Sequence, residues 1–337
     1  MEPTYERERR AALAAVREAS RLCRSVQGRL TPELRREKPD ASPVTVADFG
    51  AQALVCRRLR TDFPDDPVVG EETAEALRVD AALRARVVEE VARAVGEPFA
   101  ASEVVSWIDH GAARGAAPRY WTLDPVDGTK GFLRGANYAV ALALIEDGQA
   151  VLAALAGPRL PRAPDAEEEG VVFVAVRGQG ATAHALEVTN ERGVDGGVRL
   201  RVSRQDDPHE ARWCESLEAE HQAQAFSAGV ARAMGIRGGP RRLDSMLKYA
   251  LVARGEVELY LRVPSQPGYR EKVWDHAAGV LLIEEAGGRV TDLDGAPLRF
   301  DEPPWLLARG GVVASNSHCH EAALAAVRAV SQAPPSG

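Results

Sequence analysis

The sequence predicts an α+β fold in which helices are layered with mixed or antiparallel sheets. Strands and helices are interspersed along the chain, and several strand pairs have the spacing of hairpins. The clearest pair is Val171–Val176 and Ala181–Leu186, which are joined by Arg-Gly-Gln-Gly. No glycine-rich GxGxxG motif follows the first strand, which disfavours a dinucleotide-binding Rossmann fold. Frequent hairpins with helices between them favour layers instead.

The first half of the chain begins with a helix predicted over Tyr5 to Leu30, because apolar residues recur there at helical spacing. Two prolines then break the helical pattern between Lys38 and Pro43. The remaining elements predicted up to residue 157 are a helix at Phe49–Leu59, a strand at Val68–Glu72, a helix at Leu77–Val95, a loop with a short helix at Gly96–Ser106, and strands at Trp121–Leu123, Tyr138–Ile145 and Val151–Gly157.

The second half begins with Pro158–Gly170, which contains three prolines and three consecutive glutamates and is predicted to be an exposed loop. A strong amphipathic helix is predicted at Trp274–Ala286, closed by Gly287-Gly288. Besides the hairpin, the other predicted elements are strands at Arg199–Ser203, Arg212–Leu217, Arg241–Leu243, Val257–Leu261, Arg289–Asp292 and Gly311–Ala314, and helices at Ala223–Met234, Ser245–Arg254 and His320–Val330.

Composition excludes several classes of function. The 337 residues carry 42 basic and 49 acidic side chains, a net charge of −7 without a basic block, which argues against binding a nucleic-acid polymer. No apolar run approaches the ~18–20 residues that cross a bilayer, and the charged N-terminus lacks the apolar core of a secretory signal. We therefore expect a protein of the cytoplasm, or of a chloroplast or mitochondrion if a transit peptide has been removed.

Four cysteines are spread far apart, without a CxxC pair: Cys23, Cys56, Cys214 and Cys319. The expected state of these thiols is buried and free, and a redox-responsive pair is the alternative.

The centre of the site is expected between Tyr120 and Leu144. A short strand is predicted to end at Asp124, and Asp124-Pro125-Val126-Asp127-Gly128-Thr129 is predicted to form a tight turn. Two carboxylates three residues apart on a turn can converge on one point, where they would suit Mg²⁺, which prefers oxygen ligands. The amides of Gly128 and Thr129 would offer a seat for phosphate. Taken alone, the same residues also fit an ordinary loop.

Three further acidic residues have ordinary explanations when each is considered alone. Asp48 lies near a helix start, where a carboxylate can cap free N–H groups. Glu71 is one of two consecutive acids after a strand, of which only one can face a given side. Asp275 stands at the head of a helix beside Trp274.

Four motifs that contain these acids occur in a fixed order: Val-Thr-Val-Ala-Asp, Val-Gly-Glu-Glu, Asp-Pro-Val-Asp-Gly-Thr and Trp-Asp-His-Ala-Ala-Gly. Together they resemble the lithium-sensitive, magnesium-dependent phosphatase superfamily that includes inositol monophosphatases, from about Ala11 to Val330. The resemblance implies an α-β-α-β-α sandwich, with a lobe of residues 1–157 that carries most metal ligands, a lobe of residues 158–337 that carries nucleotide-binding residues and Asp275, and the site between them.

Within this superfamily, Gly-Thr-Lys-Gly-Phe-Leu-Arg-Gly at 128–135 and Leu-Asp-Ser-Met-Leu-Lys-Tyr at 243–249 are similar to 3′(2′),5′-bisphosphate nucleotidases. The resemblance implies removal of the 3′-phosphate of adenosine 3′,5′-bisphosphate to give AMP, with 3′-phosphoadenylyl sulfate as a related substrate. It also implies inhibition by lithium. The alternatives are an inositol phosphate or other sugar phosphatase on the same scaffold and a non-catalytic regulator that binds nucleotides or senses redox state. We expect a monomer.

The resemblance also implies roles for single residues. Two or three Mg²⁺ ions would be bound by Glu71, Asp124, Asp127, Asp275 and the Val126 carbonyl. Asp48 would pair with Thr129 to activate a metal-bound water for in-line attack, with Glu71 also in the catalytic set. The substrate would be bound by Asp127, Gly128, Thr129, His221, Ser245, Lys248, Arg262 and Asp275. His221 departs from the family pattern, because Gln222 follows where serine is usual.

Overall fold

A computed structural model describes residues 4–30, 35–37, 43–164, 166–187, 197–217, 221–263, 269–308 and 310–332. A seven-stranded sheet lies at its centre, with the strand order β3-β4-β5-β6-β7-β8-β9; β3 and β4 are parallel and the other neighbours antiparallel. Its strands are β3 (Val68–Gly70), β4 (Arg119–Asp127), β5 (Ala139–Glu146), β6 (Gln149–Pro161), β7 (Glu169–Val176), β8 (Gly180–Ala185) and β9 (Val198–Arg199).

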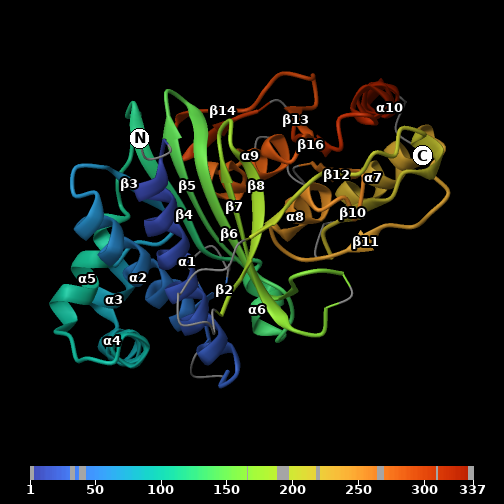
Figure 1. The fold of residues 1–337 in the computed structure, drawn as a ribbon. Helices are drawn as coiled ribbons and strands as arrows, with labels where there is room; N and C mark the ends of the chain where they lie inside the picture. The colour runs from blue at the N-terminus through green and yellow to red at the C-terminus, as the bar shows by residue number, and fades with distance from the viewer. Residues whose placement is uncertain are drawn as a thin grey trace.

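One face of this sheet is covered by helices from the N-terminal part of the chain (Figure 1). Helix α1 (Glu6–Gln27) packs on β5, β6 and β7, and α2 (Val46–Asp62) packs between α1 and β4. The outer helices of this layer are α3 (Glu75–Val79), α4 (Ala81–Val95) and α5 (Ala101–His110). Apolar side chains are buried on every side of α2, which is the reason that its sequence lacks a single apolar face.

The other face of the sheet is covered by α8 (Leu247–Ala253) and α9 (Ala277–Glu285), which separate it from a second sheet (Figure 1). The second sheet has the order β11-β10-β12-β16-β13. Its strands are β10 (Trp213–Glu215), β11 (Arg241–Arg242), β12 (Leu259–Arg262), β13 (Arg289–Asp292) and β16 (Val312–Ser315). Helices α7 (His221–Ala233) and α10 (His320–Gln332) cover its far side. The predicted five-layered α-β-α-β-α sandwich is confirmed.

The smaller elements lie around these layers. They are β1 (Arg35–Glu37) paired with β2 (Pro43–Thr45), β14 (Arg299–Glu302) paired with β15 (Trp305–Leu307), the helix α6 (Thr129–Leu133), and the 3₁₀ helices η2 (Pro208–Glu210) and η3 (Val273–Asp275). The predicted break at Lys38–Pro43 lies mostly outside the described residues. Among the described residues, no helix is both long and apolar enough to span a membrane.

Several predicted boundaries are wrong. The predicted loop at Pro158–Gly170 begins too early, because β6 continues to Pro161, and β7 already begins at Glu169. Gly157 and Pro161 pair with β7 on either side of an irregular register, which accommodates the prolines inside the strand. The predicted helix at Leu77–Val95 is divided at Asp80, which caps α4. The short helix predicted within Gly96–Ser106 is present as α5, but it begins at Ala101 and continues to His110, four residues beyond the predicted end.

The proposed lobe boundary at residue 157 remains a prediction. Strand β6 crosses it, and strands from both sides of it belong to the seven-stranded sheet.

All four cysteines are buried and free, as predicted. Burial raises the pKa of Cys214 to about 12, and it raises the pKa of Cys23 as well. Their thiolate forms are therefore scarce at neutral pH.

Candidate metal and phosphate site

The predicted turn at Asp124–Thr129 is the end of a strand. Strand β4 runs to Asp127, and its register to β5 shifts between Asp124 and Asp127. Pro125 has no N–H to donate in the hydrogen bonds between β4 and β5. The irregular register accommodates the proline and bends the end of the strand. The backbone N–H of Val126 donates to Asp124 Oδ1 over 3.1 Å, and the Thr129 hydroxyl donates to the Val126 carbonyl over 3.1 Å.

Asp48 lies in the first turn of α2 and belongs to a capping box. Thr45 caps the helix by accepting from the backbone N–H of Ala47 over 3.1 Å, and its own backbone N–H and hydroxyl donate to Asp48 Oδ2 over 2.7 and 2.6 Å. The predicted capping role is thus present. Thr45 was missed as a partner, although its position three residues before an acid in Val-Thr-Val-Ala-Asp carries the capping-box signal.

Glu71 and Glu72 follow β3 and differ in burial, as two consecutive side chains on one strand end should. Glu72 is buried, and its backbone is held by Gln52: Gln52 Nε2 donates to the Glu72 carbonyl over 2.6 Å, and the Glu72 N–H donates to Gln52 Oε1 over 3.0 Å. Glu71 is half-buried, and its N–H donates to the carbonyl of Leu123, the residue before Asp124. These contacts hold Glu71 beside β4.

Five acids from four separate parts of the chain meet at Asp124. Burial raises the pKa of the Asp124 carboxyl well above its ordinary value, and the negative charges of Glu71, Asp127, Asp275 and Asp48 raise it further. These carboxylates repel one another because too little positive charge lies nearby to balance them. Their oxygen atoms are the ligands that a hard divalent cation requires. The residues present therefore fit Mg²⁺.

Two basic residues, Lys248 and Arg262, lie close enough to Asp127 to influence its carboxyl group. Burial raises the pKa of Asp127, and the charge of Asp275 raises it further, whereas Lys248 and Arg262 lower it. The Asp127 carboxylate accepts from the backbone N–H of Met246, next to Ser245. Burial lowers the pKa of Lys248 to about 8. The site thus combines the acids around Asp124, here called the negative pole, with the basic side chains of Lys248 and Arg262 near Asp127, here called the positive pole.

Lys248 and Ser245 are held by the start of α8. Lys248 Nζ donates to the carbonyls of Leu243 and Ser245 over 3.1 and 2.5 Å. Ser245 has a φ of 72°, an uncommon left-handed conformation that a serine adopts only when the surrounding structure requires it. His221 is the first residue of α7, and its side chain lies outside the described part.

Asp275 ends the 3₁₀ helix η3, where the sequence predicted the start of a longer helix at Trp274; α9 begins only at Ala277. Arg262 donates to Asp275 Oδ2 over 2.7 Å and also contacts Glu271. Possible ligand atoms of Glu271, Asp275 and His276 all lie within 4.8 Å of one another. Because Arg262 already bridges the two carboxylates, we interpret this group as an ion-pair network.

Glu271 lies outside the four acidic motifs of the sequence. It is buried, and burial alone would raise its pKa, but the charge of Arg262 and the hydrogen bond from His276 outweigh that effect and lower the pKa of Glu271 to about 2. It is therefore a carboxylate at neutral pH. Its position four residues before the acid of the Trp-Asp motif did not distinguish it from a surface glutamate.

The backbone of Gly128 packs closely against Ser245. It has a φ of 85°, and a Cβ placed on it would lie 2.9 Å from the Ser245 Cβ. Gly128→Ala should therefore displace Ser245 as well as strain the backbone. A displacement of 1 Å in an active site can reduce the rate about 10²-fold, and we expect a loss of kcat/KM of roughly this size.

Gly178→Ala is the matched control, because Gly178 has a φ of 76° with no atom within 4 Å of the added Cβ. Both substitutions carry the left-handed backbone cost of roughly 1 kcal/mol, which thermal unfolding measures. Equal activity of the two variants would contradict a role for the contact between Gly128 and Ser245.

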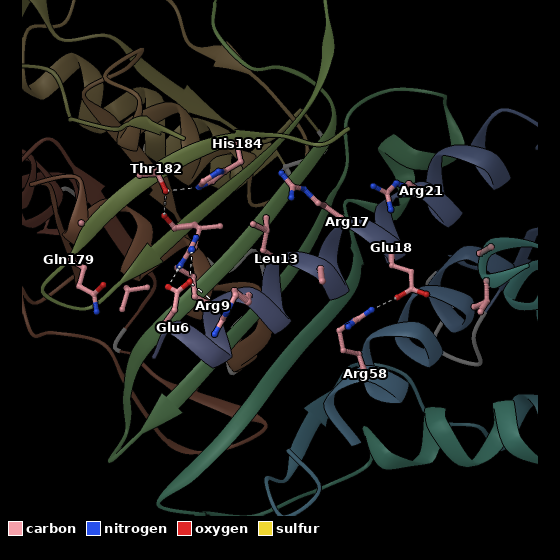
Figure 2. A pocket seen from close by; sticks show the side chains of 17 residues that line it. Glu6, Arg9, Leu13, Arg17, Glu18, Arg21, Arg58, Gln179, Thr182 and His184 are labelled. Carbon is pink, nitrogen blue, oxygen red and sulfur yellow. Dashed lines mark hydrogen bonds and ion pairs between the residues drawn. The ribbon is translucent and has the colours of Figure 1, made fainter. Parts of the chain in front are cut away.

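A separate groove of about 990 Å³ lies between α1 and strands β7 and β8, and its lining includes none of the residues predicted for the site. Figure 2 shows two of its charged pairs: Arg9 is directed to Glu6, and Arg58 is directed to Glu18. Arg21 pairs with Glu187 at 3.0 Å. Arg10 also contacts Glu6, at 3.7 Å, and Arg17 donates to the Ala185 carbonyl. The arginines of the groove therefore have partners within the protein, and we assign the groove no ligand.

The model of the "Inositol monophosphatase family" matches residues 4–332. The chain is 40% identical over 349 residues to a 3′(2′),5′-bisphosphate nucleotidase of Schizosaccharomyces pombe, which covers 98% of each chain. It is 37% identical to a 3′(2′),5′-bisphosphate nucleotidase of Oryza sativa, over 96% of this chain and 94% of that protein. Among solved structures, the Thermotoga maritima IMPase has a TM-score of 0.64 at 23% identity, covering 95% of this chain and 96% of that one. The chain therefore belongs to the inositol monophosphatase family.

Proposed function

We propose that this protein is a magnesium-dependent 3′(2′),5′-bisphosphate nucleotidase that removes the 3′-phosphate of adenosine 3′,5′-bisphosphate to give AMP. The observation that supports it best is the pair of adjoining poles. The carboxylates around Asp124 suit a cation that would hold the cleaved phosphate, and Lys248 and Arg262 lie next to Asp127, where they suit a second phosphate. A substrate with two phosphates matches both poles. Relatives of this name at 37–40% identity support the same conclusion.

The residues that would hold Mg²⁺ are Glu71, Asp124, Asp127 and Asp275, together with the Val126 carbonyl, and we propose two or three ions. Bound Mg²⁺ would supply positive charge that neutralises the phosphate ester and activates a water molecule at neutral pH. The acids themselves would be fully ionised when the cations are bound. Repulsion between the carboxylates helps to raise the pKa of Asp124, and the positive charge of the cations would lower it again.

The other site residues would orient the reactants. Asp48, held by Thr45, would accept a proton from the attacking water, and Thr129 would help to orient that water. The turn of Gly128 and Thr129 would donate to the phosphate. Ser245, Lys248 and Arg262 would hold the phosphate that stays on the product, and His221 would lie near the sugar or base.

Two alternatives have less support. An inositol phosphate or other sugar phosphatase would use the negative pole but would leave Lys248 and Arg262 without a fixed second anion. A redox-sensing regulator would need reactive thiols, whereas all four cysteines are buried and burial raises the pKa of Cys214 to about 12.

We also propose that the protein is a monomer, located in the cytoplasm or in a chloroplast or mitochondrion.

A magnesium-dependent phosphate-release assay tests the proposal. We expect kcat/KM for adenosine 3′,5′-bisphosphate to exceed that for inositol 1-phosphate by at least about 100-fold, because two charge-assisted contacts to the second phosphate are each worth roughly 1.5–3 kcal/mol. The 3′-phosphoadenylyl sulfate should also be hydrolysed. Equal or better turnover of inositol phosphates would overturn the nucleotide assignment, and absence of any magnesium-dependent activity would favour the regulator.

A further inference from the structure

A continuous series of polar contacts lies behind Arg262, among residues that the proposed mechanism does not use. The Tyr249 hydroxyl and His276 Nδ1 are 2.7 Å apart, and His276 Nε2 lies 3.3 Å from Glu271 Oε2. Both carboxylate oxygens of Glu271 contact Arg262. Arg262 Nε lies 3.1 Å from Oε1, and an Nη lies 2.7 Å from Oε2. The series connects the helix α8, through η3 and its flanks, to the end of β12.

The inner members of this series are fixed by packing. The side chains of His276 and Tyr249 are fully buried, and that of Glu271 is 5% exposed. The ring of Tyr249 lies against Gly279 of α9, where an added Cβ would be 2.4 Å from the ring, and it meets Tyr260 edge-on at 5.1 Å. Glu271 therefore has little freedom to move away from Arg262.

Arg262 is shared between two acids of different kinds. Its side chain is 29% exposed, and it contacts the buried Glu271 on one side and Asp275, which is 15% exposed, on the other. The charge of Asp275 is one of those that raise the pKa of Asp124. The charge of Glu271 is not among the main causes of that shift. The two contacts to Glu271 are made by Nε and an Nη, two atoms in the plane of the Arg262 guanidinium group. They therefore fix the orientation of that group as well as its position.

We propose that Glu271 is a positioning residue that sets Arg262 against the phosphate that is not cleaved, and that His276 and Tyr249 hold Glu271 in the required orientation. This inference rests on the proposed nucleotidase function. Because Glu271 engages Arg262 through both Nε and an Nη, Asp275 receives Arg262 through a single contact of 2.7 Å. Without that carboxylate, the guanidinium would turn toward the acids of the negative pole and away from the second phosphate.

Glu271→Gln tests the inference, because it keeps the size of the side chain and removes its charge. We would measure kcat/KM for adenosine 3′,5′-bisphosphate and for adenosine 3′-phosphate, which lacks the second phosphate. The ratio of the two values should fall about ten-fold or more, since a bidentate charge-assisted contact loses its charge. Calorimetry with AMP, which keeps the second phosphate, should show a similar loss of affinity without turnover.

Glu258→Gln is the matched control. Glu258 is also fully buried and is held by an arginine, with Arg212 contacts of 2.6 and 3.2 Å, and it immediately precedes β12. Its removal should lower stability and leave the substrate ratio unchanged. Glu271 would be only structural if its variant lost activity on both substrates by one factor, or if both variants changed the ratio equally.

Tyr249→Phe provides a second test that keeps the packing of the ring. It removes only the hydroxyl next to His276, so the substrate ratio should fall about three-fold, as for one neutral hydrogen bond. If Glu271→Gln does not fold, Tyr249→Phe becomes the test of the inference. An unchanged substrate ratio in Tyr249→Phe would then refute the inference. Wild-type protein without a preference for the bisphosphate would instead refute the proposed function itself.

Discussion

Asp124→Asn should reduce kcat/KM at least ~10³-fold, the size of effect expected when a principal electrostatic stabiliser is lost. Asparagine has the same shape and can still accept from the Val126 N–H, so the backbone of β4 should stay in place. What is lost is the central charge of the acidic group, and with it the affinity for Mg²⁺. The measurements are phosphate release and the rise in the unfolding temperature on addition of Mg²⁺, which should disappear in the variant.

Asp292→Asn is a fitting control for this substitution. Asp292 is 4% exposed, lies on β13 outside the site, and accepts from two backbone N–H groups at 3.0 and 2.9 Å. This variant should keep its response to Mg²⁺ and most of its activity. If Asp124→Asn hydrolysed adenosine 3′,5′-bisphosphate at a rate close to that of the wild type, the acidic residues around Asp124 would not be the reaction centre.

The second large effect concerns the stability of the metal-free protein. The pKa values of Asp124 and Asp127 are raised in the folded state, so the folded protein holds protons that the unfolded chain has already released. Stability from this source is fully present below the ordinary aspartate pKa of about 3.9 and is lost as pH rises through the raised values. For each retained proton, the free energy of unfolding should fall by up to about 1.4 kcal/mol per pH unit.

This trend is best measured as the difference between wild type and Asp124→Asn in chelator, between pH 5 and pH 7. His320 has the opposite effect, because burial lowers its pKa to about 4 and the unfolded chain binds that proton more tightly. Lys248, with a pKa lowered to about 8, has its influence above this window. Both contributions are the same in the two proteins and cancel. Asp124→Asn should therefore become the more stable protein as pH rises, and saturating Mg²⁺ should abolish its advantage.

An equal dependence on pH in the two metal-free proteins would contradict the raised pKa of Asp124. It would mean that the acids lie too far apart, or are too well solvated, to repel one another. The same result would weaken the argument that the site needs cations to balance its charge.

Much of the site could be predicted from residue type and order. The four acidic motifs, the positive φ of Gly128 and the capping position of Asp48 are local properties, and local sequence carries them. Boundaries were predicted less well. Pro158 indicates a loop when considered alone, yet pairing with β7 keeps it inside β6. The contribution of a neighbouring strand is not encoded at the proline itself.

By itself, the sequence determined which chemistry is available: oxygen ligands for a hard cation, a glycine-bearing turn for phosphate, and basic residues for a second anion. Only the tertiary structure decided how these groups are combined. Asp48, Glu71, Asp127 and Asp275 raise the pKa of Asp124 because four elements distant in sequence are packed together. Likewise, Arg262 is divided between Glu271 and Asp275 because β12 and η3 meet. Charge interactions depend on separation in space and on burial, which neither spacing nor composition of the chain reports.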